Sequence, residues 1–494
     1  MVGQENLKKI RRLERKKDEE SAPRSPAVVD HGEPTWRLVL ALAWPVLAQQ
    51  FLILTVGIVD RFLAGRVESD AGAEAVAYQA AQSTAQYLTW FVSSYAVLIS
   101  AGSTALVARC IGAGDRRLAR QVTHQSLLLA VIFGLLGSGV GLLGLESIVA
   151  FMQLRGAAAV FAVSYLQPLF GLLVFQLVEA AGIACLIGAG DTRTGMWVLA
   201  GVTLVNVPLS LALFYGCGPV PALGFVGIAW GTALSFTIGG LAVLAVLIRG
   251  RAGLRLRLRY CLPDGSLIYR LLRISVPAGM DSLSVALGHL WFVSIINQLG
   301  NAAAAAHGIA LTWEALAFLS GYSFGMAAMT LVGQNLGANR PDRAAHSGWV
   351  AFAIGGGLMC VMGVLFFALA RPMFGIFCPK PEQLPAIAAG VPALRLVAFA
   401  MPALASCIIF TQALRGAGDT RVPLLFTWIG FLGVRIPLAY LLTRPEVSLG
   451  PLGTLPGMDL GLFGAWLAMF ADLHVRGAFF VWRFASGRWQ RLQV

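Results

Sequence analysis

Long apolar segments separated by short polar stretches recur along almost the whole chain. Each is about 22–29 residues long, so a helix rising 1.5 Å per residue would span about 33–44 Å, enough to cross a hydrocarbon core of about 30 Å. A bilayer offers no water to backbone groups, and barrel strands would be shorter and alternating, so helices are expected. The pattern predicts an all-α polytopic membrane protein with twelve transmembrane helices, bounded approximately at 37–62, 74–100, 121–148, 160–187, 195–216, 223–248, 270–298, 303–330, 345–371, 389–414, 422–443 and 460–484.

The second half of the chain repeats landmarks of the first half in the same order. Residues 188–193 and 416–421 share the letters GAGDTR, at an offset of 228 positions (416 − 188). Such a turn can end one helix on glycine and cap the next with Asp or Thr. Further pairs lie at similar offsets: 105–114 with 330–339 (225), Pro45 with Pro277 (232), and Gly224 with Gly461 (237). We expect two six-helix repeats, which enter from the same side because six is even and are therefore related by an axis along the membrane normal.

Composition and charge agree with a membrane protein and orient it. The 494 residues are 57% hydrophobic and only 12% charged, against about 25% in soluble proteins. Of the 37 Lys and Arg residues, 28 fall in the N-terminal tail and the loops on one side, and about seven on the other. The positive-inside rule therefore predicts an inner cell-membrane protein with both termini in the cytoplasm. The charge forms no nucleic-acid stripe, and the seven cysteines show no paired spacing, which indicates mostly free thiols.

The repeat divides the chain into five parts. A polar cytoplasmic tail that sets orientation, or alternatively binds a partner, comes first, and a basic linker joins the two lobes. The expected boundaries are 1–35 for the tail, 36–248 for the N-lobe with helices 1–6, 249–269 for the linker, 270–484 for the C-lobe with helices 7–12, and 485–494 for a second cytoplasmic tail.

The motifs in this order resemble the multidrug and toxic compound extrusion (MATE) family over about residues 36–490. The resemblance rests on the GAGDTR turn after helix 10, LVGQNLGA after helix 8, Val59-Asp60 in helix 1, and the ending Trp482 to Trp489. It implies a two-lobed secondary antiporter, and no enzyme, with lobes of helices 1–6 and 7–12 that face a central cavity. Such an exporter exchanges protons or sodium ions for a bulky, usually cationic compound, without a cofactor. We expect a monomer whose partners are the bilayer and a small molecule.

Ionisable residues within membrane helices are costly, so they are the candidates for coupling. The resemblance implies that Asp60 matches the helix-1 aspartate of the DinF-like branch and Asn206 its polar partner. That branch's acid four residues later is Ser210 here, and the helix-10 acid of the other branch has no match. Alternatively, Asp60 only pairs with a nearby arginine. The C-lobe adds Asp281, Glu314 and Asp472 to the coupling candidates; the alternative for each is a polar contact between helices.

Comparison of the two repeats singles out a charged pair. Asn206 corresponds to Arg435 and Ser235 to Asp472, so both positions are neutral in the first copy and oppositely charged in the second. We expect Arg435 and Asp472 to form a buried pair between helices 11 and 12. His289 and His307 are expected to be packing histidines, since no His/Cys cluster has the spacing of metal ligands.

Candidates for a cavity that binds aromatic cations are mostly aromatic or polar, with lipid-facing positions as the alternative for the aromatics. They are Gln49, Tyr87, Trp90, Trp313 and Arg435. A rival of similar plan, a lipid-linked oligosaccharide flippase, would favour several arginines for a pyrophosphate group. An intramembrane enzyme or an ATP-driven pump is not expected, because the sequence holds no HExxH, GxSxG or Walker motif.

Overall fold

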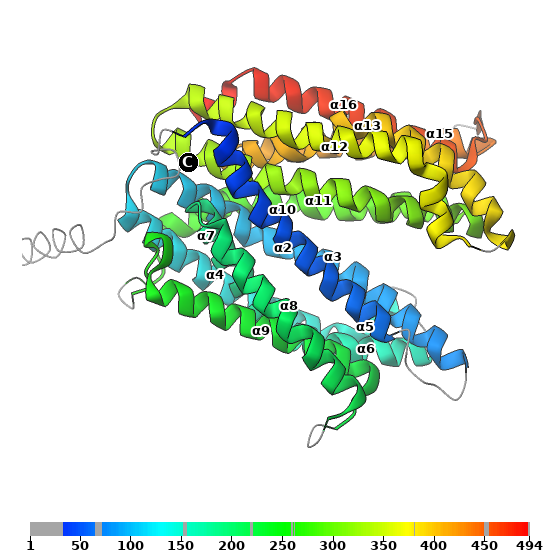
Figure 1. The fold of residues 1–494 in the computed structure, drawn as a ribbon, viewed down its shortest axis with the longest axis horizontal. Helices are drawn as coiled ribbons and strands as arrows, with labels where there is room; N and C mark the ends of the chain where they lie inside the picture. Colours follow the sequence, from blue (N-terminus) through cyan, green and yellow to red (C-terminus); the bar gives the residue numbers. More distant parts are fainter. Residues whose placement is uncertain are drawn as a thin grey trace, which may run out of the picture.

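The computed structural model describes residues 33–64, 72–151, 156–217, 221–257, 260, 262–379, 381–448 and 454–492. These residues form long helices and one short hairpin (Figure 1). The helices of the first repeat are α2 (Thr35–Ala64), α3 (Gly72–Gly112), α4 (Arg116–Leu143), α5 (Leu145–Phe151), α6 (Ala157–Gly171), α7 (Leu173–Gly188), α8 (Thr192–Tyr215) and α9 (Gly224–Arg249). Those of the second are α10 (Gly265–Asn297), α11 (Asn301–Gly337), α12 (Pro341–Phe377), α13 (Leu384–Gly416), α14 (Arg421–Trp428), the π-helical η5 (Ile429–Arg435), α15 (Ile436–Thr443) and α16 (Gly461–Ala485).

Each of the twelve expected segments corresponds to a helix or a broken helix of the described chain. Ten spans are long and apolar enough to cross a membrane, and α6 with α7 forms an eleventh that bends by 51°. The twelfth, α16, is not among these spans; it carries Asp472, Arg476 and Arg483. It nevertheless packs against α13 and α15 inside the bundle. The predicted twelve-helix, two-repeat fold is confirmed.

Equivalent glycines take the same backbone conformation in both repeats. Gly190 and Gly418 follow the fourth helix of each repeat with φ of +89° and +82°, and Gly224 and Gly461 begin the sixth helix of each with φ of +55° and +53°. A side chain is strained at such φ values, so glycine is expected there. The repeat read from the sequence is therefore also a repeat of backbone geometry.

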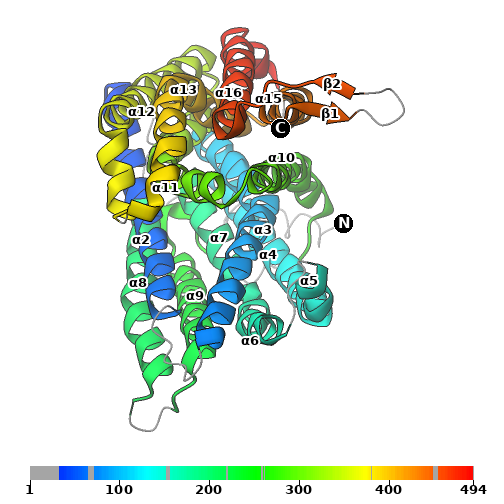
Figure 2. The same ribbon diagram turned by 90° about the vertical axis from the view of Figure 1, so that its right-hand side faces the viewer.

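The lobes are joined by their first two helices. In the N-lobe, α2 packs against α8 but also against α11 of the C-lobe, while α10 of the C-lobe packs against α3. Figure 2 separates the remainder, with α12, α13 and α16 on one side and α6, α8 and α9 on the other. In Figure 1 these two groups of helices lie close together near the C-terminus and diverge toward the other end.

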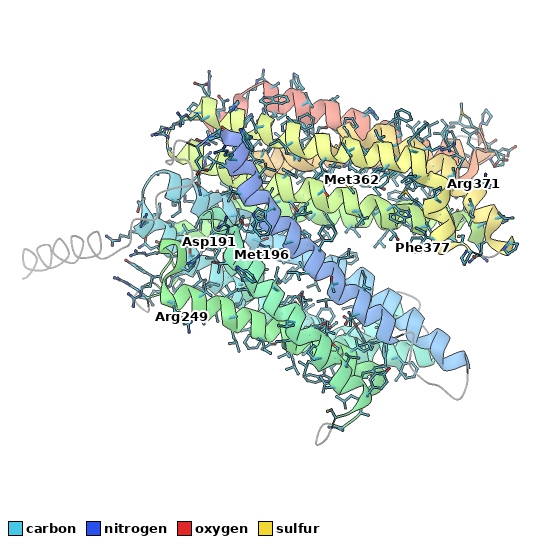
Figure 3. All side chains as sticks on the ribbon, in the orientation of Figure 1. Asp191, Met196, Arg249, Met362, Arg371 and Phe377 are labelled. Atoms are coloured by element: carbon cyan, nitrogen blue, oxygen red, sulfur yellow. The ribbon has the colours of Figure 1, made fainter. Side chains whose placement is uncertain are left out.

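We call the end of the bundle near the C-terminus the terminal end, and the opposite end the distal end. Figure 3 shows Asp191 and Arg249 at the terminal end and Arg371 and Phe377 at the distal end. This sidedness agrees with the loop assignment made from the charges. The terminal end is the side that the sequence predicts to be cytoplasmic.

Several helices extend beyond the apolar segments that predict them. The eighth helix was expected at 303–330, but α11 continues to Gly337, and α3 continues to Gly112 rather than stopping near residue 100. The added turns contain polar residues that are buried between the two lobes. Hydropathy alone does not show this burial, so it ends the predicted helices too early. Arg109, which was counted as a loop residue, lies in the last turn of α3.

Other departures involve irregular segments. The fourth helix was expected to be continuous, but it breaks at Leu172, and the eleventh contains the π-helical η5. The hairpin β1 (Glu446–Ser448) and β2 (Thr454–Pro456) was not predicted. The seventh helix begins at Gly265, five residues before the expected 270, because Asp264 caps it. The Ser266 hydroxyl and the Leu267 and Ser266 amides donate to this exposed carboxylate and lower its pKa.

Candidate functional site

A buried polar cluster lies inside the N-lobe where α2, α8 and α9 meet. The Thr232 hydroxyl of α9 donates to Asp60 Oδ2 of α2 at 3.0 Å, and Asn206 Nδ2 of α8 donates to Thr232 Oγ1 at 3.2 Å. All three side chains are buried, with exposed fractions of 7%, 0% and 9% for Asp60, Asn206 and Thr232. The structure thus brings together Asp60 and Asn206, with Thr232 as a linking residue that the sequence analysis missed.

The N-lobe cluster holds an acid without a cationic partner. Asp60 forms no ion pair with any described side chain, and its Oδ1 is buried without a hydrogen bond, as are Asn206 Oδ1 and Ser210 Oγ. The side chain of Arg61 lies outside the described residues, as does Arg66. The unused oxygens of Asp60 and Asn206 can accept a proton or coordinate a small cation.

A second buried acid, Glu179 on α7, lies in the same lobe. Its exposed fraction is 3%, and its Oε1 has no hydrogen-bond partner among the described residues. This oxygen packs against Gly239 of α9, where a Cβ would approach it to 2.6 Å. The N-lobe interior therefore contains two carboxyl groups that pair with no positive charge among the described side chains.

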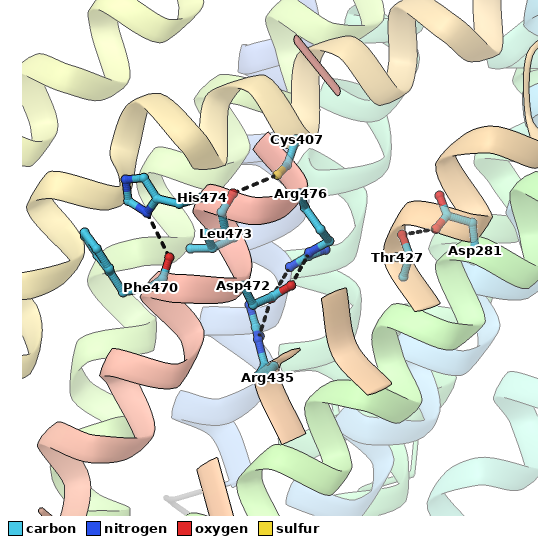
Figure 4. A network of polar contacts seen from close by, with 9 residues as sticks. All are labelled: Asp281, Cys407, Thr427, Arg435, Phe470, Asp472, Leu473, His474 and Arg476. Atoms are coloured by element: carbon cyan, nitrogen blue, oxygen red, sulfur yellow. Dashed lines mark hydrogen bonds and ion pairs between the residues drawn. The ribbon is translucent and has the colours of Figure 1, made fainter. Parts of the chain in front are cut away.

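In the C-lobe interior, by contrast, a buried acid is paired with arginines. Asp472 of α16 accepts from Arg435 Nε at 2.8 Å and from Arg476 Nε and Nη2 at 2.6 Å each (Figure 4). All three residues are buried, at 2% exposed for Arg435, 0% for Asp472 and 7% for Arg476. The predicted Arg435–Asp472 pair is confirmed, and Arg476 is a third member. We call these residues the C-lobe triad; it carries one excess positive charge when all three are ionised.

The π-helical η5 positions Arg435 in this triad. Its last residue, Arg435, also lies over the rings of Phe292 at 5.4 Å and Phe431 at 4.5 Å. A π-turn inside an α-helix costs regular hydrogen bonding and occurs frequently at functional sites. The sequence offered a signal for the charge at this position, through the comparison with Asn206, but none for the π-turn.

Asp281 is held by a separate set of contacts. Arg415 Nη2 pairs with Asp281 Oδ2 at 2.7 Å, and the Thr427 hydroxyl donates to Asp281 Oδ1 at 2.5 Å. Arg415 was counted among the loop arginines, but it lies in the last turn of α13 and is 6% exposed. Asp281 is thus already neutralised, in contrast to Asp60, and its predicted role in coupling stays a prediction.

Glu314 and His307 lie on one face of α11 and are poorly paired. Glu314 Oε2 and both ring nitrogens of His307 are buried without hydrogen-bond partners among the described residues. The His307 ring lies edge-on to Phe292 at 5.9 Å and to Trp466 at 5.6 Å. No three His, Cys, Asp or Glu side chains of the described chain come close enough to hold a metal ion.

The predicted cavity residues have different surroundings. Gln49 is 5% exposed, and its amide donates to the Thr192 carbonyl at 3.0 Å, which ties α2 to the start of α8. The partly buried Trp313 ring packs edge-on against Phe377 at 5.8 Å. Arg435 belongs to the triad, and the side chains of Tyr87 and Trp90 lie outside the described residues. The assignment of these five residues to a substrate cavity stays a prediction.

The repeated motifs of the two lobes meet at the terminal end. Arg109 Nη2 of α3 donates to the Ala417 carbonyl in the C-lobe turn at 2.7 Å. Reciprocally, Gln334 Nε2 of α11 donates to the Gly188 carbonyl in the N-lobe turn at 3.0 Å. Arg109 and Gln334 are equivalent at the offset of 225 (334 − 109), so each lobe donates a hydrogen bond to the GAGDTR turn of the other, at carbonyls one position apart in the motif.

Glycines allow the two lobes to approach at the same place. A Cβ at Gly112 would collide with the carbonyl of Gln334, and a Cβ at Gly337 with the carbonyl of Arg109. These glycines are again equivalent at the offset of 225 (337 − 112). We call this arrangement of Arg109, Gly112, Gln334 and Gly337 the terminal-end latch, because it joins the lobes at one end of the bundle.

The GAGDTR turns do not cap identically. Asp191 accepts from the Thr194 amide at 3.1 Å and pairs with Arg251 at 2.8 Å, so the predicted cap is confirmed in the first copy. In the second copy Asp419 instead pairs with Arg483 of α16 at 2.8 Å, and no side chain caps α14. In both turns the aspartate therefore pairs with an arginine that lies in, or just after, the last helix of the same lobe.

The two six-helix lobes form a membrane fold of parallel repeats, an architecture that occurs in transporters. The model of the family described as MatE matches residues 45–212 and 277–441, more than half of the chain. The chain therefore belongs to the MatE family, the multidrug and toxic compound extrusion transporters.

The similarity to known proteins extends over nearly the full chain. It is 27% identical over 459 residues to the probable multidrug resistance protein NorM of Thermotoga maritima, covering 92% of this chain and 93% of that protein. It is 29% identical over 437 residues to the multidrug resistance protein PmpM of Pseudomonas aeruginosa, covering 86% and 88%. A multidrug resistance MATE family transporter solved in an outward-facing conformation superimposes with a TM-score of 0.83 at 19% identity, over 94% of this chain and all of that one.

Proposed function

We propose that this protein is a secondary antiporter that exports bulky, cationic compounds in exchange for protons or sodium ions. The observation that carries the proposal is the buried carboxylate of Asp60, which pairs with no described basic side chain and is linked through Thr232 to Asn206. An unpaired acid within a membrane segment is expensive, so its presence favours a role in binding a cation. The multidrug resistance names of the relatives support export of foreign compounds.

The position of Asp60 suits a coupling residue in this conformation. Asp60 lies four residues before the distal end of α2, whereas the latch closes the opposite end of the bundle. If the terminal end is cytoplasmic, a cation arriving from outside meets Asp60 first. Binding there would neutralise the carboxylate and change the packing of α2 against α8 and α9, which provides the coupling to a lobe movement.

The rival function, flipping of a lipid-linked oligosaccharide, receives less support. It would need free arginines facing a cavity to hold a pyrophosphate. The buried arginines described in the C-lobe are all paired, Arg435 and Arg476 with Asp472 and Arg415 with Asp281. Each of their positive charges therefore already has a carboxylate partner inside the lobe.

Transport by the full chain in liposomes tests the proposal. Export of a fluorescent cationic dye is measured under an imposed proton gradient and, separately, an imposed sodium gradient. Asp60→Asn should abolish export driven by the effective gradient while the protein remains in the membrane. The matched control is Asp459→Asn, which changes an exposed acid at the distal end and should export normally. Full export by Asp60→Asn would contradict the assignment of coupling to Asp60.

A further inference from the structure

The outer face of the N-lobe carries an apolar groove between α8 and α9. It has a volume of about 310 Å³ and is lined by residues of both helices. The lining residues of α8 include Thr194, Trp197, Gly201 and Val205, which recur at intervals of three or four and therefore share one helix face. A Cβ placed at Gly201 would meet no atom within 4 Å, so this glycine keeps the middle of the groove open.

The groove lies on a surface that faces the bilayer. Both α8 and α9 are long and apolar enough to cross a membrane. Large apolar side chains beside the groove point outward, with Trp197 70% exposed on α8 and Leu241 52% exposed on α9. Within a bilayer such positions meet hydrocarbon, so lipid acyl chains are the molecules available to fill the groove.

The length of the groove matches the depth of one leaflet. Thr194 is the third residue of α8 at the terminal end, and Val205 lies eleven residues further, or roughly 16 Å at 1.5 Å per residue. On α9, which runs the other way, Val246 lies three residues before the end of the helix, and Ile238 eight residues before Val246. Half of a hydrocarbon core of about 30 Å is about 15 Å, so the groove runs from the terminal-end surface to the middle of the bilayer.

Arginines surround the mouth of the groove at the terminal end (Figure 3). Arg251 Nε donates to Asp191 Oδ2 at 2.8 Å and to Oγ1 of Thr194, the first lining residue, at 3.2 Å. Arg193 directly precedes Thr194, and Arg249 ends α9. Both are exposed, and neither forms an ion pair with a described side chain. The mouth therefore combines an apolar opening with positive charge that Asp191 only partly offsets.

We propose that this groove binds an anionic phospholipid of the terminal-end leaflet, with an acyl chain between α8 and α9 and the phosphate at Arg193 and Arg249. Each part of the site suits one part of the lipid. The groove is one leaflet deep and takes the chain, whereas the guanidinium groups donate charged hydrogen bonds to the phosphate. A zwitterionic lipid offers the same chain, but its ammonium group repels the arginines. The inference concerns the outer surface of the N-lobe and does not depend on the proposed antiport.

Native mass spectrometry of the purified full chain, titrated with phosphatidylglycerol or phosphatidylcholine, tests the headgroup half of the site. The wild type should retain one phosphatidylglycerol in preference to phosphatidylcholine. An arginine near an anionic headgroup contributes about fivefold in affinity, so Arg193→Gln/Arg249→Gln should weaken this retention roughly 25-fold. The matched control is Arg340→Gln/Arg343→Gln, which removes two exposed arginines at the terminal end of the C-lobe and should bind as the wild type does.

The acyl-chain half of the site is tested by filling the groove. Gly201→Leu places a side chain in the open space and should abolish retention of phosphatidylglycerol without a change of charge. Gly139→Leu is the control, because that glycine of α4 also has no atom within 4 Å of an added Cβ, and it should bind normally. In liposomes, brominated chains should quench Trp197, read as the difference from Trp197→Phe, at a several-fold lower fraction of phosphatidylglycerol than of phosphatidylcholine.

Three results would overturn the inference. The first is equal retention of the two lipids by the wild type, or unchanged retention of phosphatidylglycerol in both Arg193→Gln/Arg249→Gln and Gly201→Leu. The second is displacement of the lipid by inorganic phosphate, which would show that the arginines recognise phosphate without a chain. The third is a dimer in the same spectra that Gly201→Leu abolishes, which would show that a second copy of the chain covers the groove.

Discussion

Asp472→Asn should destabilise the protein more than Arg435→Gln, although both remove one charge from the same triad. Asp472 accepts three hydrogen bonds from two arginines, so its replacement leaves two buried guanidinium groups without a counter-charge. Removing one partner of a buried pair costs about 3–5 kcal/mol, and here the loss is at or above the upper end of that range. Arg435→Gln instead leaves Asp472 paired with Arg476 through both oxygens.

The smaller cost of Arg435→Gln can be estimated from its contacts. The substitution removes one charged hydrogen bond, about 1.5–3 kcal/mol, together with the contacts of the guanidinium with two rings. It also removes the desolvation cost of a guanidinium that is 2% exposed, which offsets part of the loss. We therefore expect a loss of about 2 kcal/mol or less.

Equilibrium unfolding in mixed detergent micelles, together with membrane yield, measures this difference. A further comparison uses the third member of the triad. The double variant Arg435→Gln/Asp472→Asn still leaves Arg476 unpaired and should not recover, whereas adding Arg476→Gln should restore part of the stability. The reasoning is refuted if Arg435→Gln is as damaging as Asp472→Asn, or if the double variant recovers fully.

Three other predictions concern coupling, the latch and orientation. Asp60→Asn should lose gradient-driven dye export while Asp459→Asn keeps it, as measured in liposomes; equal export would remove Asp60 from the mechanism. The latch can be tested in a cysteine-free background that carries one cysteine at position 108 in place of Ala108. Gly112→Ala should speed labelling of that thiol from the terminal end several-fold, because the added Cβ collides with the facing lobe. The matched control is Gly139→Ala, whose Cβ meets no atom within 4 Å, and it should leave the labelling rate unchanged. Single cysteines at Asp264 and at Glu446 should be labelled from opposite sides of the membrane, the first from the cytoplasm; labelling of both from outside would contradict the orientation.

The sequence by itself determined the number of helices, the two-repeat plan and the family. These features depend only on the order of residues along the chain. A membrane span requires a sufficient length of apolar residues, and a repeat requires similar residues at a constant offset. The same comparison of copies predicted the Arg435–Asp472 pair, because opposite charges appeared together at equivalent positions. Asp60 could also be identified from the sequence, because the free-energy cost of an acid inside an apolar membrane segment follows from the segment itself.

Tertiary structure alone decided which groups share a partner and which have none. Arg415 and Arg109 looked like loop arginines, but one neutralises Asp281 and the other crosses to the opposite lobe. Arg476 donates two hydrogen bonds to Asp472, and Glu314 Oε2 has no hydrogen-bond partner among the described residues. Such assignments depend on distances between helices that are far apart in the chain. The energy of a buried charge is set by these neighbours and by the water they exclude, and a one-dimensional pattern contains neither.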